Sequence, residues 1–166
     1  MRKKTAHLFL TASVLIWGTW FGGQFFNWAM VIPKRLSNPP DSIREYAVIP
    51  VEGGFPFFYL NPFFFLFSLV AMLLGWKWSK QSRKWLMLSC IVSLSVSLVL
   101  IFYLAPLIHS IDYIAGQQGL PSQEIIRRVD EWKSGNVIRL VFDFVGFFLS
   151  VIALKTWSAE ASTIST

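Results

Sequence analysis

Four apolar segments, each about as long as a membrane-crossing helix, constrain the fold of this chain more than any other feature. They cover residues 8–32, 57–76, 85–108 and 137–157. A helix needs about 20 apolar residues to cross the hydrocarbon core of a bilayer. Hydrophobic residues make up 54% of the 166 residues and charged residues only 14%, which is more apolar surface than one soluble core of this size can bury. The sequence therefore predicts an all-α integral membrane protein, with a single four-helix transmembrane domain over residues 1–166.

The positions of lysine and arginine predict the topology of these four helices. Basic residues without accompanying acids occur at residues 2–4 and in the connection at 77–84. Connections on the cytoplasmic side of a membrane usually carry such an excess. We therefore expect the N- and C-termini to be cytoplasmic, with two long outward loops at about 33–56 and 109–136. The plasma (inner) membrane is the expected location.

The second outer loop contains a short amphipathic pattern in the stretch PSQEIIRRVDEWKSG. Ile125, Val129 and Trp132 recur on one helical face, while glutamate and arginine residues pair on other faces. The pattern predicts a short amphipathic helix before the fourth span, lying at the outer membrane surface and ending near Gly135. The first outer loop is rich in proline and glycine, which favours turns.

Small residues recur at spacings that allow membrane helices to approach closely. We expect them to pack the helices of one bundle together, and a homo-oligomer formed through the first segment is the alternative. They are Gly18 and Gly22 in the first segment, Ser89, Ser93 and Ser97 in the third, and Gly146 and Ser150 in the fourth.

Two charged residues, Arg139 and Asp143, lie inside the fourth apolar segment. Their spacing of four places them on one helical face, about 6 Å apart along the helix axis. A charge in the middle of a bilayer costs at least about 2.5 to 3.5 kcal/mol. We therefore expect both side chains to face the bundle interior and to contact each other or the first and third helices. They form either a structural ion pair or one side of a site that opens outward.

Other polar residues are expected at a similar depth in the membrane. If all of them face inward, they form a polar cup beneath the outer loops, and such concave sites bind small molecules. His109 and Asp112 could supply two metal ligands, but the sequence offers no evident third, so no metal is predicted. The expected members of the cup are Gln24, Asn27, Asn61, His109, Asp112 and Asn136, with Trp132 beside them.

The net charge of +6 is not arranged as a basic stripe with stacking aromatic residues, which argues against a nucleic-acid partner. The expected partners are the lipid bilayer and, as alternatives, another membrane protein or a second copy of the chain. The sequence contains no P-loop, G-x-S-x-G or HExxH pattern.

Several motifs together resemble the anthrone oxygenase-like family of small four-helix membrane proteins, most of which have no known function. The resemblance extends over nearly the whole chain, and its most specific part is the W-x-x-x-N-x-I-R pattern. The motifs are FFNWAMVIP at 25–33, the Asn61-Pro62 step followed by FFFLF, Pro106 with His109, and Trp132, Asn136, Ile138 and Arg139.

The resemblance implies an oxidoreductase or oxygenase that acts on an aromatic or lipid-like substrate. Some relatives oxidise anthrones to anthraquinones with molecular oxygen as co-substrate and without a metal or flavin, so no cofactor is expected. By this resemblance His109 would be the base that forms the substrate anion, and Asn136 and Arg139 would stabilise its oxygen. His109 stands where relatives often have asparagine. The substrate-binding residues would be Asn27, Asn61, Trp132 and Asp143.

Two other functions remain open from the sequence. The first is a non-enzymatic tetraspan protein that serves as an accessory or assembly subunit of a larger membrane complex. The second is a small-molecule carrier, although no inverted repeat of the kind found in many transporters is visible.

Overall fold

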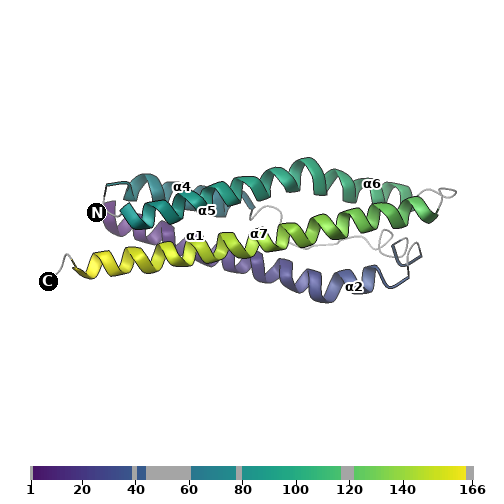
Figure 1. The fold of residues 1–166 in the computed structure, drawn as a ribbon, viewed down its shortest axis with the longest axis horizontal. Helices are drawn as coiled ribbons and strands as arrows, with labels where there is room; N and C mark the ends of the chain where they lie inside the picture. Colours follow the sequence, from purple (N-terminus) through teal and green to yellow (C-terminus); the bar gives the residue numbers. More distant parts are fainter. Residues whose placement is uncertain (1, 39–40, 44–60, 78–79, 117–121, 164–166) are drawn as a thin grey trace. The chain divides into compact units, whose positions relative to one another are not determined.

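The computed structural model describes residues 2–38, 41–43, 61–77, 80–116 and 122–163, and all regular elements in these ranges are helical (Figure 1). The predicted all-α class is therefore confirmed. The elements are α1 (Arg2–Phe26), the π-helix η1 (Asn27–Val31), α2 (Ile32–Arg35), α4 (Asn61–Gly75), α5 (Lys80–Val99), the π-helix η3 (Leu100–Leu104), α6 (Ala105–Gly116) and α7 (Ser122–Thr163).

Three helical segments are long and apolar enough to cross a membrane, which is consistent with an integral membrane protein. They are Lys4–Lys34, Lys80–Ile111 and Gln123–Glu160. The predicted second span corresponds in part to α4, whose apolar portion, Phe65–Gly75, is shorter than a full crossing. Residues 57–60 of that predicted span lie outside the described residues.

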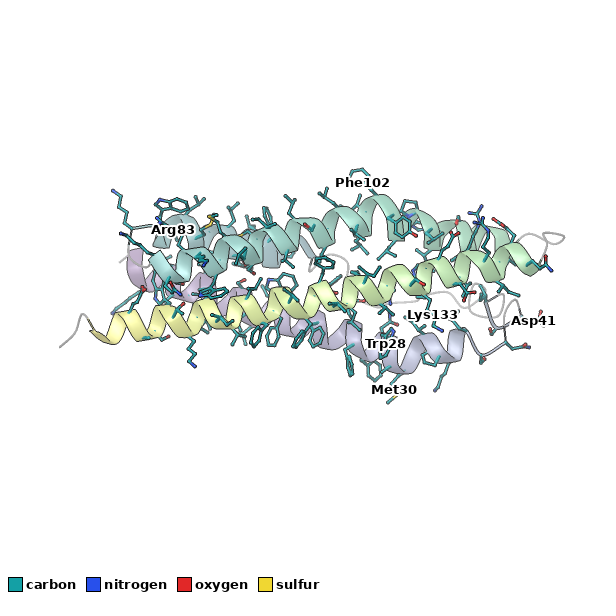
Figure 2. All side chains as sticks on the ribbon, viewed as in Figure 1. Trp28, Met30, Asp41, Arg83, Phe102 and Lys133 are labelled. Carbon is teal, nitrogen blue, oxygen red and sulfur yellow. The ribbon has the colours of Figure 1, made fainter. Side chains whose placement is uncertain are left out.

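Many large apolar side chains point away from the protein. Phe102 is 75% exposed, Met30 is 58% exposed, and both project from their ribbons (Figure 2). In a soluble protein such an apolar surface would indicate an interface, whereas in a membrane it faces lipid. The exposed aromatic and aliphatic side chains thus agree with the hydropathy of the three long segments.

The first and third predicted spans continue beyond their expected ends at residues 32 and 108. The first continued helix contains Pro33 and the other contains Pro106. In both, a π-helical turn ends two residues before the proline. Proline lacks an N–H group, and its ring clashes with the carbonyl four residues earlier in an ordinary α-helix. The wider π turn accommodates the ring within a continuing helix. The backbone N–H groups of Ile32 and Ala105 donate to the carbonyls of Asn27 and Leu100, five residues earlier.

The short amphipathic helix predicted before the fourth span is not separate, because α7 runs without a break from Ser122 to Thr163. The expected end near Gly135 is wrong. A Cβ atom at Gly135 would lie 2.9 Å from Leu104 Cδ2 and 3.0 Å from Tyr103 Cε1. Glycine costs a helix interior about 1 kcal/mol relative to alanine. Here the missing side chain permits close packing of α7 against η3. Gly135 is therefore a packing residue within α7 and does not end the helix.

The expected apolar face of this segment is nevertheless confirmed. Ile125 and Val129 are buried in one cluster with Ile43 and Ile111, and Trp132 packs against that cluster. The face therefore packs against protein, where the sequence had suggested contact with the membrane surface.

The described chain forms two compact units, each of which contains parts of the long helices. The first unit comprises the described residues within 1–22, 56–97 and 141–166, and the second comprises those within 23–55 and 98–140. The cluster around Ile125 is the core of the second unit. One hydrophobic cluster in the first unit comprises Ala6, Leu10, Ala71, Leu86, Ala153 and Trp157.

Buried serines join α5 to α7 within the first unit. Ser82 Oγ donates to the carbonyl of Ala153 at 2.9 Å, and Ser89 Oγ donates to the carbonyl of Gly146 at 3.4 Å. A step of seven forward along α5 corresponds to a step of seven backward along α7, so these helices are antiparallel. The predicted packing role of the serine stripe is thus confirmed for Ser89, and Ser93 is also buried.

Glycines allow α1 and α7 of the first unit to approach closely. A Cβ atom at Gly146 would lie 2.4 Å from Trp17 Cη2, and one at Gly18 would lie 3.2 Å from Phe147 Cε2. By contrast, a Cβ atom at Gly22 would have no described neighbour within 4 Å. Gly18 therefore has the predicted packing role within the chain, whereas no described residue packs against Gly22.

Candidate functional site

Three polar side chains of α7 are buried within an otherwise apolar segment. The exposed fractions are 2% for Asn136, 5% for Arg139 and 0% for Asp143. Spacings of three and four residues place them along one face of the helix. Burial of Arg139 and Asp143 agrees with the expectation that membrane charges face protein rather than lipid.

In the second unit, Arg139 is hydrogen-bonded to a polar residue of α1. Arg139 Nη2 donates to Gln24 Oε1, and the Gln24 side chain is itself buried. This bond has an ionised donor, and bonds of this kind are stronger than bonds between neutral groups. Gln24 thereby fixes one edge of the guanidinium plane.

Asn136 lies one helical turn before Arg139, and its amide has unused hydrogen-bonding capacity. The buried Nδ2 atom has no hydrogen-bond acceptor among the described residues. A buried donor without an acceptor costs roughly 1 to 3 kcal/mol, so such groups usually have a partner. We call Gln24, Asn136 and Arg139 the polar site. It presents amide and guanidinium donors in apolar surroundings.

In the first unit, Asp143 accepts a hydrogen bond from α1. Trp20 Nε1 donates to Asp143 Oδ1 at 3.0 Å, and both side chains are fully buried. The indole N–H is a donor on a large apolar side chain, which suits a carboxylate surrounded by membrane-spanning helices. Trp20 was not among the residues expected in the site. Its position on the helical face shared with Gln24, four residues away, is the signal that could have identified it.

The other residues expected in the polar cup differ in how far they are buried and in what they contact. Asn27 is half-buried and begins η1, one turn after Gln24, while Trp132 packs against the apolar cluster of the second unit. His109 is exposed on α6 and has no hydrogen-bond partner among the described residues. The side chains of Asn61 and Asp112 lie outside the described part of the structure.

Within the described ranges, no three histidine, cysteine, aspartate or glutamate side chains come together in a group that could hold a metal ion. The arrangement of donors in the polar site suits an oxygen acceptor, either a carbonyl or an oxyanion.

A groove of about 710 Å³ lies in the second unit, between the α5–η3 junction and α7. It extends along α7 from Arg127 to Ile138, with Val99 and Tyr103 on the opposite side. None of the residues expected in the polar cup is among its described lining residues. The groove and the polar site are therefore separate features of the second unit.

No protein-family model, curated protein or solved structure matches this chain.

Proposed function

We propose that this chain is a small membrane oxidoreductase that binds the oxygen atom of an aromatic or lipid-like substrate at the polar site. The observation that carries the proposal is the buried Asn136 Nδ2 donor, without an acceptor among the described residues, one turn from Arg139. An amide N–H and a guanidinium can together stabilise an oxyanion, because both donate hydrogen bonds to developing negative charge.

The proposed chemistry is oxidation of a phenolic or anthrone-type substrate, as the resemblance to anthrone oxygenase-like proteins implies. Loss of a proton gives an electron-rich anion whose charge resides largely on oxygen, and this anion reduces molecular oxygen. For an anthrone, one oxygen atom enters the ring carbonyl that forms from the CH₂ group. The other oxygen atom leaves as water with the two hydrogens of that group. The reaction therefore requires oxygen but no other oxidant.

The proposed roles divide between binding and proton transfer. Arg139 and Asn136 hold the substrate oxygen, and Gln24 orients Arg139. His109, whose side chain is exposed on α6, is the proposed proton acceptor. Asn27 and Trp132, which also belong to the second unit, are the further proposed contacts to substrate.

The proposed setting is a four-helix bundle in the plasma membrane. The excess of basic residues at 2–4 and 77–84 supports cytoplasmic termini, with both long loops facing outward. Under that topology the polar site belongs to the outward half of the protein, where an amphiphilic substrate can enter from the outer leaflet.

The test is oxygen uptake by the full-length protein in nanodiscs supplied with anthrone or a hydroquinone. An Asn136→Ala variant should lower the rate about 10²-fold, the effect typical of removing one oxyanion donor. The matched control is Lys133→Ala, which alters an exposed residue of the same helix. Protein-free nanodiscs give the rate of spontaneous oxidation. Equal rates with wild-type protein, the Asn136 variant and empty nanodiscs would contradict the proposed function.

A His109→Ala variant tests the proposed base separately. General-base catalysis typically contributes about 10²- to 10⁴-fold, so the rate should fall by at least about 10²-fold while substrate binding is retained. An unchanged rate would remove His109 from the mechanism. The alternative function, an accessory subunit of a larger complex, predicts no oxygen uptake and one stable protein partner after mild purification.

A further inference from the structure

The groove in the second unit joins two different environments along α7. Its charged part includes Arg127, Asp130 and Glu131, and its apolar part includes Val99 and Ile138. Ile138 lies eleven positions after Arg127, which is about 16 Å along a helix. The groove therefore begins beside the charged segment of α7 and ends beside the apolar segment that follows.

The apolar part of the groove is open to the surroundings of the protein. Val99, Tyr103 and Ile138 are 40%, 49% and 59% exposed, respectively. Within a membrane, side chains of this kind face acyl chains, while charged side chains lie at the level of lipid headgroups. A ligand that fits both parts has a polar head and an apolar tail, which is the structure of a lipid.

Charges in the groove indicate which headgroup it accepts. Arg127 Nη1 donates to Glu131 Oε1 at 2.7 Å, and Arg127 Nη2 is 2.9 Å from Glu124 Oε1, so two carboxylates already satisfy the guanidinium. The Asp130 carboxylate has no hydrogen-bond or ion-pair partner among the described residues. Among the described lining residues there are two acids and one base, so this part of the groove favours a positively charged headgroup.

A primary ammonium fits these acceptors better than a quaternary one. It has three N–H donors, which can reach Asp130 and Glu131 together, whereas a trimethylammonium group has none. Gly135 also lines the groove, and Tyr103 packs directly against its backbone.

We propose that this groove is a binding site for an aminophospholipid of the phosphatidylethanolamine type. Its ammonium binds Asp130 and Glu131, and its acyl chains lie along Val99, Tyr103 and Ile138. The volume of about 710 Å³ is within the usual range of small-molecule sites. This site is independent of the polar site, because the two share no described residue.

The test is lipid retention by the full-length protein, measured by native mass spectrometry after release from nanodiscs. The nanodiscs contain equimolar dioleoyl phosphatidylethanolamine, phosphatidylcholine and phosphatidylglycerol. Wild-type protein should retain phosphatidylethanolamine about tenfold over phosphatidylcholine, as expected when charge-assisted hydrogen bonds are made to one headgroup only. The double variant Asp130→Asn with Glu131→Gln should lose this preference.

Two further variants distinguish lipid binding in the groove from the general effects of a lost charge or of altered folding. Glu124→Gln removes a carboxylate of the same helix that is not among the described groove residues, and it should keep the preference. Ile138→Trp fills the apolar part from an exposed position, so the protein should fold normally and retain less phosphatidylethanolamine. Equal retention of phosphatidylethanolamine and phosphatidylcholine by wild-type protein would overturn the proposal. So would a preference for phosphatidylglycerol, or an unchanged preference in the double variant.

Discussion

Replacing Arg139 by leucine should lower the rate of anthrone oxidation about 10³-fold, the upper end of the effect of removing one oxyanion-stabilising donor. Arg139 supplies the only positive charge of the polar site, and its guanidinium is held by Gln24. In apolar surroundings a fixed cation stabilises developing negative charge far more than it would in water. Oxygen uptake in nanodiscs is the measurement, and Arg139→Lys, which keeps the charge but not the planar fork, should have an intermediate rate.

A loss of activity must be distinguished from a loss of folding. In Arg139→Leu the buried Gln24 carbonyl loses its donor, so the variant should be less stable than wild type. The double variant Gln24→Leu with Arg139→Leu removes both polar groups and should recover stability without recovering activity. The coupling between the two residues should be about 0.6 to 2 kcal/mol by double-mutant cycle. Full activity in the double variant would exclude Arg139 from the mechanism.

Hydropathy alone is sufficient to locate the long helices of this protein. Twenty or more consecutive apolar residues have few alternatives to a membrane-crossing helix, because every backbone polar group must be satisfied within it. The ends of the helices are harder to predict. The first and third spans were expected to end at residues 32 and 108, but a single π turn before Pro33 and before Pro106 lets each helix continue. Gly135 suggested another break, yet it lies where η3 packs against α7.

The burial of Arg139 and Asp143 could be predicted because exposing a charge to lipid is costly. Their hydrogen-bond partners could not be predicted from the sequence. Gln24 and Trp20 become partners only through the register of α1 against α7, and that register depends on side-chain packing. In the first unit, Trp17 against Gly146 is one contact that sets it.

His109 was expected in the polar cup because of its depth in the membrane, and depth does not determine which way a side chain points. The π turn η3 inserts one extra residue before α6. One residue of an α-helix corresponds to a rotation of about 100°, so the faces of α6 cannot be extrapolated from those of α5.

Replacing Gly146 by alanine should destabilise the protein by about 1 to 3 kcal/mol, the usual cost of overpacking a core. The added Cβ atom would lie 2.4 Å from Trp17 Cη2 and 2.6 Å from Trp17 Cζ2. Trp17 is fully buried, so its rigid ring cannot move aside without displacing its own neighbours. A larger residue, as in Gly146→Leu, should cost more. Thermal unfolding in detergent, followed by tryptophan fluorescence, measures the effect.

Gly22→Ala is the matched control, because it adds the same methyl group to α1 where no described atom lies within 4 Å. That variant should be as stable as wild type or more stable by up to about 1 kcal/mol, the difference in helix propensity between the two residues. Combining Gly146→Leu with Trp17→Ala should recover part of the lost stability, since the leucine would occupy space left by the indole. If Gly146→Ala and Gly22→Ala prove equally stable, α1 and α7 cannot be packed as closely as Trp17 and Gly146 require. The hydrogen bond from Trp20 to Asp143, one turn along the same pair of helices, would then lose its structural support.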